Sequence, residues 1–227
     1  MSARDEVFAA IRRSLHVTGK ETPRQAAVAS RLAETPAGVI PERGQGSPQQ
    51  RAATFLAEVI RARATVAEVA RAEDIPAEIA RFLRENNLPA TLRMGDDARL
   101  AGLPWGATTL GISHGPSDGH DLNAVSAAFA AIAETGTLAM VSGRDNPTTL
   151  NFLPDNHVAV VFADDLVGDL ESVFNKLRSV YGAGEAPRTL NFITGPSRSG
   201  DIEQTLLLGA HGPRRLHVVL VGGAQAP

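Results

Sequence analysis

The sequence predicts an α/β protein in which a mostly parallel sheet carries helices on both faces. Short apolar runs rich in Val, Leu and Ile alternate with longer segments whose apolar residues recur at helical spacing. Gly, Pro, Asn and Asp residues separate the two kinds of segment. Strands that alternate with helices are typical of parallel sheets, because parallel neighbours need a long crossover connection that is usually a helix.

The N-terminal residues predict a helix followed by an arm. Ser2 can cap the helix, and the apolar residues after it form one stripe at helical spacing: Val7, Phe8, Ile11 and Leu15. Prolines punctuate residues 18–50, which indicates a linker or an extended arm with a short helix near residues 25–33. Composition alone does not distinguish an arm that packs on a surface from a floppy tail. Because the apolar stripe of the first helix has nothing local to cover, we expect the arm to pack on the core or on a second subunit of a homo-oligomer. We divide the chain into an N-terminal helix and arm (1–50) and an α/β domain (51–227).

Three helices are expected in or at the start of the α/β domain. Ser47 and Gln50 form a capping box for a helix that continues through Ala62. A second helix over residues 74–85 begins at Asp74 and carries Pro76 in its first turn. A third follows over residues 170–181, where Gly182 ends the apolar periodicity.

The expected strands are apolar runs bounded by turn residues. They span residues 66–69, 90–94, 108–112, 138–141, 158–162, 190–193 and 216–221. An Ala-rich segment leads from Ala124 to Glu134. Parallel sheets bind ligands beyond the carboxyl ends of their strands, so we look for a site in the loops there.

Composition limits the chemistry of these 227 residues. Because they contain no cysteine, they form no disulfide and supply no thiolate for an iron–sulfur cluster. We expect this chain to bind no cofactor. The net charge of −3 argues against a broad nucleic-acid surface, which needs a basic face. No run approaches the roughly 18 apolar residues of a membrane span and no signal peptide is evident, so a cytoplasmic location is expected.

The turn before residue 138 is the first candidate site. Glu134 stands beside a glycine-containing turn, where a carboxylate can act as a general base, a nucleophile or a positioning group. Thr135, Gly136 and Thr137 would supply neighbouring ligand contacts. The alternative is a carboxylate in a structural hydrogen bond at the end of a helix.

The loop over residues 195–203 directly follows an expected strand. Gly195, Pro196 and Ser197 open it, and backbone N–H groups of such a loop can bind a phosphate or a carboxylate. Asp201 and Glu203 suggest that a helical turn follows, and they favour a helix N-terminus whatever the function. The loop lacks both the Walker ending and the dinucleotide fingerprint.

The loop over residues 209–217 offers an imidazole and cations. His211 lies between small residues and can serve in acid–base chemistry, with Gly212 beside it. Arg214 or Arg215 could hold a carboxylate by a bidentate pair. His217 falls in an apolar run, which favours a hydrogen-bonded core residue.

Two further groups of histidines carry less weight. The loop over residues 114–121 holds two histidines and two aspartates, but their spacing matches no metal site that we can justify, so no metal is expected. His157 opens an expected strand. It either faces the same crevice as the loops above or is a structural histidine.

Four segments in a fixed order resemble the LUD-domain family. They are residues 132–138 (IAETGTL), 151–154 (NFLP) followed by His157, 194–203 (TGPSRSGDIE) and 208–217 (LGAHGPRRLH). The resemblance covers roughly residues 52–221. It implies a fold like ribose-5-phosphate isomerase and CoA transferases. It also implies a part in oxidising L-lactate to pyruvate beside two iron–sulfur partner proteins.

Three functions follow as expectations. The first is a non-redox subunit of a cytoplasmic complex oxidising L-lactate, binding a small anionic ligand. The second is a stand-alone isomerase, acyl-transfer or ligase-type enzyme that uses Glu134 on a phosphorylated or CoA-linked substrate. The third is a non-catalytic ligand-binding module. In the first two, Glu134 and His211 are the candidate catalytic residues, converging with the 195–203 loop at the carboxyl end of the sheet.

Overall fold

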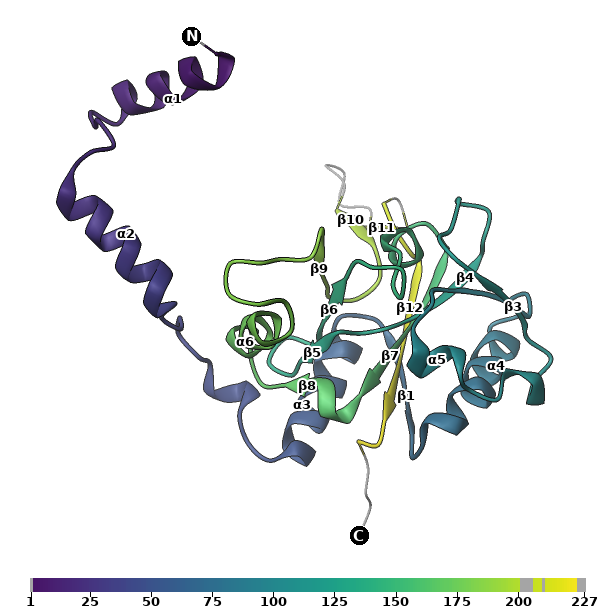
Figure 1. The fold of residues 1–227 in the computed structure, drawn as a ribbon. Coiled ribbons are helices and arrows are strands. Elements are labelled where there is room, and N and C mark those ends of the chain that lie inside the picture. The colour runs from purple at the N-terminus through teal and green to yellow at the C-terminus, as the bar shows by residue number, and fades with distance from the viewer. Residues whose placement is uncertain (1, 201–205, 210, 224–227) are drawn as a thin grey trace. The chain divides into compact units, whose positions relative to one another are not determined.

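The computed structural model describes residues 2–200, 206–209 and 211–223. It divides into two compact units, Met1–Val39 and Ile40–Pro227. Figure 1 shows the helices of the first unit and the sheets of the second. The units divide between residues 39 and 40, ahead of the boundary at residue 50 that the sequence suggested.

The first unit contains two helices. In α1 (Ala3–Ser14), Ser2 and Asp5 form a capping box, as the sequence predicted for Ser2. α2 (Thr22–Glu34) is longer than the expected short helix and has Pro23 in its first turn. Neither helix has a buried residue, and the apolar stripe of α1 is exposed, from 42% at Phe8 to 59% at Leu15.

The main sheet of the second unit is entirely parallel, which confirms the predicted fold class. Its strands, in spatial order, are β1 (Thr65–Val69), β12 (Arg215–Val221), β7 (Asn156–Phe162), β4 (Asn123–Ala127), β2 (Thr91–Met94) and β3 (Gly111–His114). The two long central strands pair from Arg215↔Asn156 to Val221↔Phe162. Val is the most frequent residue in both, as expected of strands buried on two faces.

A second sheet was not expected. Its order is β8 (Leu166–Val167), β5 (Ala130–Ile132), β6 (Thr137–Val141) and β9 (Leu190–Ile193). β6 is antiparallel to both β5 and β9, and only β5–β8 is parallel. The Ala-rich segment that we left unassigned forms β4 and β5, one strand in each sheet. Residues 138–141 and 190–193 are strands as predicted, but they pair antiparallel in this second sheet.

Helices cover the sheets in layers. α3 (Pro48–Arg61) and the second sheet pack on one face of the main sheet, through Phe55, Leu138 and Val218. α4 (Ile75–Glu85) packs on the opposite face, through Ile79, Phe82 and Val219. α6 (Leu170–Tyr181) covers the outer face of the second sheet. Short elements join these layers: η1 (Glu42–Gly44), η2 (Ala72–Asp74), α5 (Ala98–Ala101), η3 (Trp105–Ala107), η4 (Thr148–Asn151) and η5 (Ala163–Asp165).

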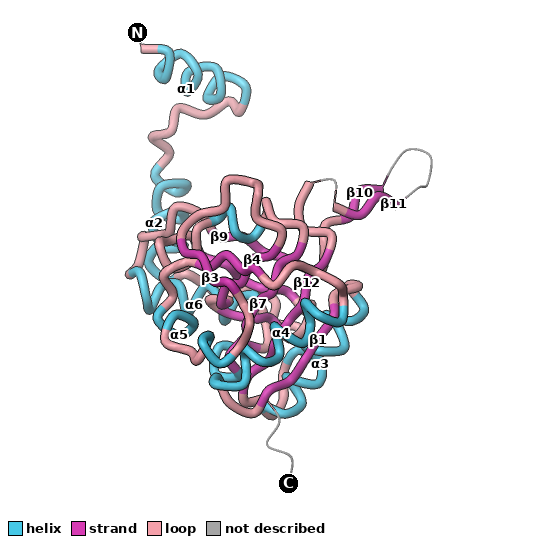
Figure 2. Tube along the Cα trace, turned by 90° about the vertical axis from the view of Figure 1, so that its right-hand side faces the viewer, coloured by secondary structure: helices cyan, strands magenta, loops and turns pink. Residues whose placement is uncertain are grey.

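A small hairpin, β10 (Arg198–Gly200) with β11 (Leu206–Leu208), precedes the last strand. Figure 2 shows it projecting from the body of the second unit. The sequence had suggested a helical turn after Gly200. That turn lies outside the described residues, and the segments on either side of it are antiparallel strands, with Arg198 paired to Leu208.

Residues 40–50 pack on the rest of the second unit. Gly44 is buried, and a Cβ there would lie 2.0 Å from the Gly168 carbonyl oxygen. The Gln45 side chain donates a hydrogen bond to Asp169 at 3.0 Å. The end of the predicted arm therefore packs on the α/β core, whereas the packing of residues 18–39 stays a prediction.

Gly136 offers a test of how closely the β5–β6 turn approaches α3. Its φ is +64°, and a Cβ would lie 2.6 Å from the Val59 backbone nitrogen. Gly136→Ala should lower the free energy of unfolding by about 2–4 kcal/mol, because backbone strain and a clash with helix backbone combine. Gly115→Ala is the matched control, since Gly115 also has positive φ but open space around it. It should lose only about 1–2 kcal/mol. Equal losses in urea unfolding would contradict the close approach.

Candidate functional site

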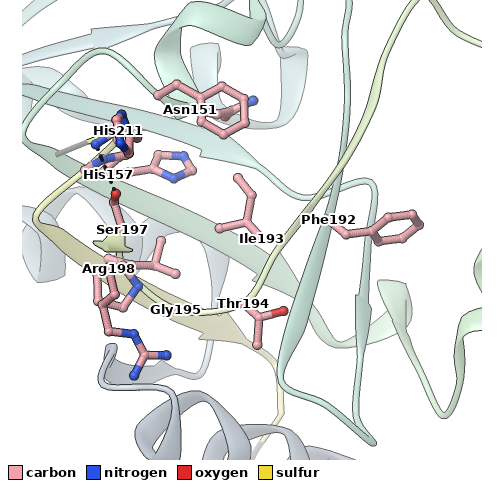
Figure 3. A pocket seen from close by; sticks show the side chains of 14 residues that line it. Asn151, His157, Phe192, Ile193, Thr194, Gly195, Ser197, Arg198 and His211 are labelled. Carbon is pink, nitrogen blue, oxygen red and sulfur yellow. Dashed lines mark hydrogen bonds between the residues drawn. The ribbon is translucent and has the colours of Figure 1, made fainter. Parts of the chain in front are cut away.

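A cavity of about 270 Å³ lies on the face of the main sheet that packs on the second sheet. His157 and Leu216, near the starts of β7 and β12, form part of its wall, and the end of β9 forms another part. Its polar lining residues, several of which Figure 3 shows, are Asn151, His157, Thr194, Ser197, Arg198 and His211. The volume falls below the roughly 300–1,000 Å³ of sites for drug-sized ligands, so a small molecule suits it best.

The cavity lies at the amino ends of β7 and β12, so our expectation of a site at the carboxyl ends is wrong for it. The reason is the path of the chain after β9. That strand belongs to the second sheet, and the β10–β11 hairpin then returns the chain to the start of β12. The loops on both sides of the hairpin therefore meet at the amino edge of the main sheet.

Ser197 joins these two loops. Its backbone N–H donates to the Pro213 carbonyl at 2.9 Å, and its own carbonyl accepts from Gly209 N–H at 3.0 Å. Its hydroxyl oxygen lies 3.4 Å from the His211 backbone nitrogen, which donates to it (Figure 3). Gly195 is required by packing, since a Cβ there would lie 2.3 Å from the Ala62 carbonyl oxygen. The two loops thus form one connected wall.

His157 belongs to a buried hydrogen-bonded chain. Ser126 donates its hydroxyl proton to Asn151 Oδ1 at 2.9 Å, and the same hydroxyl oxygen lies 2.6 Å from His157 Nε2. His157 is only 1% exposed, and its Nδ1 has no hydrogen-bond partner among the described residues. In Figure 3 its ring points into the space between Asn151 and Ile193. Burial lowers the pKa of His157 to about 4, so the ring is neutral near pH 7.

The charges around the cavity favour an anion. Arg198 and the two histidines line it, and no carboxylate does so among the described residues. Arg198 and His211 are exposed at the rim, whereas His157 lies in the wall. A guanidinium and several hydroxyl or N–H donors are the groups that bind carboxylates and phosphates.

The structure brings together part of the predicted site. Five of the predicted residues line the cavity: Gly195, Pro196, Ser197, His211 and Gly212. Asp201 and Glu203 lie outside the described residues. The sequence had not pointed to Ser126 or Thr194 as site residues, because single hydroxyls in a strand or loop carry no pattern of their own.

The lining does not include four other predicted contacts: Thr135, Gly136, Thr137 and Arg214. Arg214 lies outside it, 3.8 Å from a carboxylate oxygen of Asp155 in a largely exposed pair. Thr135 and Thr137 approach it only indirectly. Their hydroxyls lie 2.7 Å apart, and Thr137 reaches the hydroxyl of the lining residue Thr194, also at 2.7 Å.

Glu134 does not share a crevice with His211, which corrects the predicted convergence. It is 6% exposed and does not line the cavity. Its Oε1 accepts a hydrogen bond from the Leu170 backbone at 3.3 Å, at the start of α6. The β5–β6 hairpin explains the placement, because its turn is held by α3 on one side and by the Gly168 carbonyl on the other. This contact agrees with the structural hydrogen bond that we had kept as the alternative for Glu134.

The remaining histidines lie elsewhere. His217 is buried, stacks on Phe82 with ring centroids 4.1 Å apart and contacts the Thr65 hydroxyl at 2.8 Å, so its core assignment is confirmed. In the 114–121 loop, Asp121 pairs with Arg93 at 3.0 Å. Within the described residues no group of three or more His, Asp or Glu is placed to hold a metal ion.

Comparison with known proteins gives a family match for part of the α/β domain. Residues 123–221 match the family described as LUD domain, so the resemblance to the LUD-domain family is confirmed over that segment. A crystal structure of a DUF162 family protein from Deinococcus radiodurans superposes with a TM-score of 0.58 at 23% identity. The match covers 78% of this chain and 100% of that one, and it shows the same fold.

Several proteins named Lactate utilization protein C are similar to part of this chain. The one from Shouchella clausii is 33% identical over 90 residues, which is 40% of this chain and 39% of the relative. That of Bacillus subtilis is 34% identical over 91 residues, covering 40% and 38%. That of Exiguobacterium sp. is 36% identical over 98 residues, covering 43% of each. The matched region thus spans about two-fifths of these relatives. Across the described residues, no helix is long and apolar enough to cross a membrane.

The buried neutral His157 predicts a defined loss of stability in acid. Its pKa falls from the ordinary 6.5 to about 4 on folding, so between these values the unfolded chain takes up a proton that the folded chain refuses. Stability should therefore be full above pH 6.5 and fall as the pH drops toward 4, by roughly 3 kcal/mol in total from this group.

His157→Gln removes this titration and should make urea-unfolding free energies less dependent on pH between 7 and 4.5. His120→Gln, at an exposed loop position, is the control and should keep the wild-type slope. An unchanged slope in His157→Gln would show that the buried ring does not govern this window.

Proposed function

We propose that this chain acts in lactate utilization as a non-redox subunit that binds a small anionic ligand in the cavity. The observation that carries the proposal is the composition of the cavity wall, which offers an arginine, two histidines and hydroxyl donors without a described carboxylate. The names of the relatives supply the biological setting. The proposed complex works in the cytoplasm.

The binding chemistry follows from the wall. The Ser197 hydroxyl and the exposed His211 can hydrogen-bond a carboxylate, while Arg198 adds positive charge at the rim. Ile193 and Leu216 give the same cavity an apolar side suited to a methyl group. A three-carbon carboxylate therefore fits within the cavity and matches its wall in charge and polarity.

In this proposal, partner proteins carry out the electron transfer. Oxidation of L-lactate to pyruvate releases two electrons, and these 227 residues contain no cysteine to ligate an iron–sulfur cluster. We therefore place the clusters on partner proteins, with this chain binding and positioning the ligand.

The alternative of a stand-alone isomerase or acyl-transfer enzyme depended on Glu134 as the reactive carboxylate. Glu134 instead holds the start of α6 and does not line the cavity. The geometry therefore favours ligand binding over covalent chemistry at Glu134.

His211 gives the direct test of the binding site. His211→Ala should weaken L-lactate binding by the full chain about tenfold in isothermal titration calorimetry, because one polar contact to the anion is lost. The melting temperature should stay nearly constant, since the side chain is exposed. His120→Ala and Glu134→Gln are controls and should bind as the wild type does. Absence of binding of any small carboxylate to the wild type would overturn the proposal.

Co-purification tests the proposed association of this chain with iron–sulfur partner proteins. The tagged chain, purified from lactate-grown cells of its own source, should elute with iron-containing proteins. The chain produced alone should elute colourless, without iron or flavin. Stoichiometric iron or flavin on the isolated chain would contradict the assignment of redox centres to partners.

A further inference from the structure

The hydrogen bonds around Ser126 fix the proton on His157. A serine hydroxyl has one proton to donate, and Ser126 donates it to Asn151 Oδ1. The contact of 2.6 Å between the same oxygen and His157 Nε2 is then a hydrogen bond only if Nε2 carries the proton. A neutral imidazole protonated at Nε2 has a bare lone pair at Nδ1. The chain therefore makes Nδ1 an acceptor.

This acceptor is unused within the described protein. His157 is 1% exposed, its ring forms part of the cavity wall, and Nδ1 has no partner there. A buried polar atom without a partner is disfavoured by about the energy of the hydrogen bond that it lacks. Because Nδ1 itself exposes less than 1 Å², a ligand hydroxyl recovers that energy only when a neighbouring side chain of the wall shifts and uncovers this atom.

We propose that His157 is the specificity-determining residue of the cavity, and that its Nδ1 accepts a hydrogen bond from a ligand hydroxyl. A 2-hydroxy carboxylate is then bound in preference to the corresponding 2-oxo carboxylate. This inference rests on the proposed function, since it assigns the second polar contact of the same small anion. The carboxylate contacts Ser197 and His211, and the adjacent hydroxyl contacts His157.

The chemistry of the two ligand classes explains the preference. A hydroxyl group donates one hydrogen bond, whereas a ketone oxygen carries only lone pairs. A ketone placed against Nδ1 would set two acceptors against each other and leave both unpaired. Sites built to hydrogen-bond a substrate hydroxyl reject the analogue that lacks the donor for this reason. A protonated ring would donate from Nδ1 and would therefore favour the ketone, but burial holds the pKa of His157 at about 4.

A ligand series on the wild-type chain tests the proposal directly. L-lactate, pyruvate and propionate share a carboxylate and a three-carbon skeleton, and they differ at C2 in carrying a hydroxyl, a ketone or neither. Calorimetry at pH 7.5 should give L-lactate roughly ten- to a hundredfold tighter binding than pyruvate or propionate. Equal affinities for the three would overturn the inference while leaving anion binding intact. If none of the three binds, both the inference and the proposed function fail.

Two matched variants test whether His157 causes the preference for L-lactate over pyruvate. His157→Gln keeps a nitrogen donor that can reach Ser126 but has no counterpart of Nδ1, so the ratio of L-lactate to pyruvate affinity should fall to within about threefold of unity. His217→Gln is the control, because His217 is equally buried but on the opposite face of the main sheet. It should keep the wild-type ratio. A wild-type ratio in His157→Gln, or its loss in both variants, would refute the assignment.

The tautomer of His157 can be measured on the wild-type chain, so this test does not depend on the folding of a variant. Nitrogen-15 NMR of the wild-type ring, with L-lactate and without it, should show a neutral imidazole with the proton on Nε2 in both states. An imidazolium in the bound state would show that His157 pairs with the carboxylate instead, and would overturn the proposal.

Discussion

The two sheets of the α/β unit meet across alanines. Ala128, Ala131, Ala133 and Ala159 are fully buried in one cluster with Phe55 and Leu138. Because these side chains are small, β5 and β6 can lie close to β4 and β7 while α3 fills the remaining space. β9 pairs with β6, so the position of its carboxyl end depends on this contact. The cavity exists because that end is brought beside the starts of β7 and β12.

The same packing explains why Glu134 is where it is. The β5–β6 turn is held between α3 and the start of α6, and its carboxylate accepts a hydrogen bond from the Leu170 N–H at that helix start. Asp169 accepts from Ser172 N–H at 2.9 Å beside it, and Gln45 then binds Asp169. A candidate catalytic carboxylate is thereby used to join the 40–50 segment, the second sheet and α6.

Local patterns predicted the elements well and their partners poorly. The capping box at Ser47, the start of α6 after Asp169 and the apolar strands β1, β2, β7 and β12 were readable because each depends on neighbouring residues. The second sheet was not, because an apolar run has the same pattern whether its neighbour is parallel or antiparallel. The described parts of the 195–203 and 209–217 loops lie together, as predicted. They lie at the amino ends of the main-sheet strands, because β9 belongs to the second sheet and not to the main one. The acceptor at His157 needed three residues from β4, η4 and β7, which no spacing along the chain reveals.

The hydrogen bonds of Ser197 also bear on how this domain can vary. They close the base of the β10–β11 hairpin, so that the cavity wall is held before the chain departs into β10 and after it returns from β11. The entropy of closing a loop grows only slowly with its length. Segments of different length can therefore be accommodated beyond this closure without shifting Ser197, His211 or Gly212. This hairpin is thus a natural point for related proteins to differ in size, and a suitable insertion point for a reporter peptide beside the cavity.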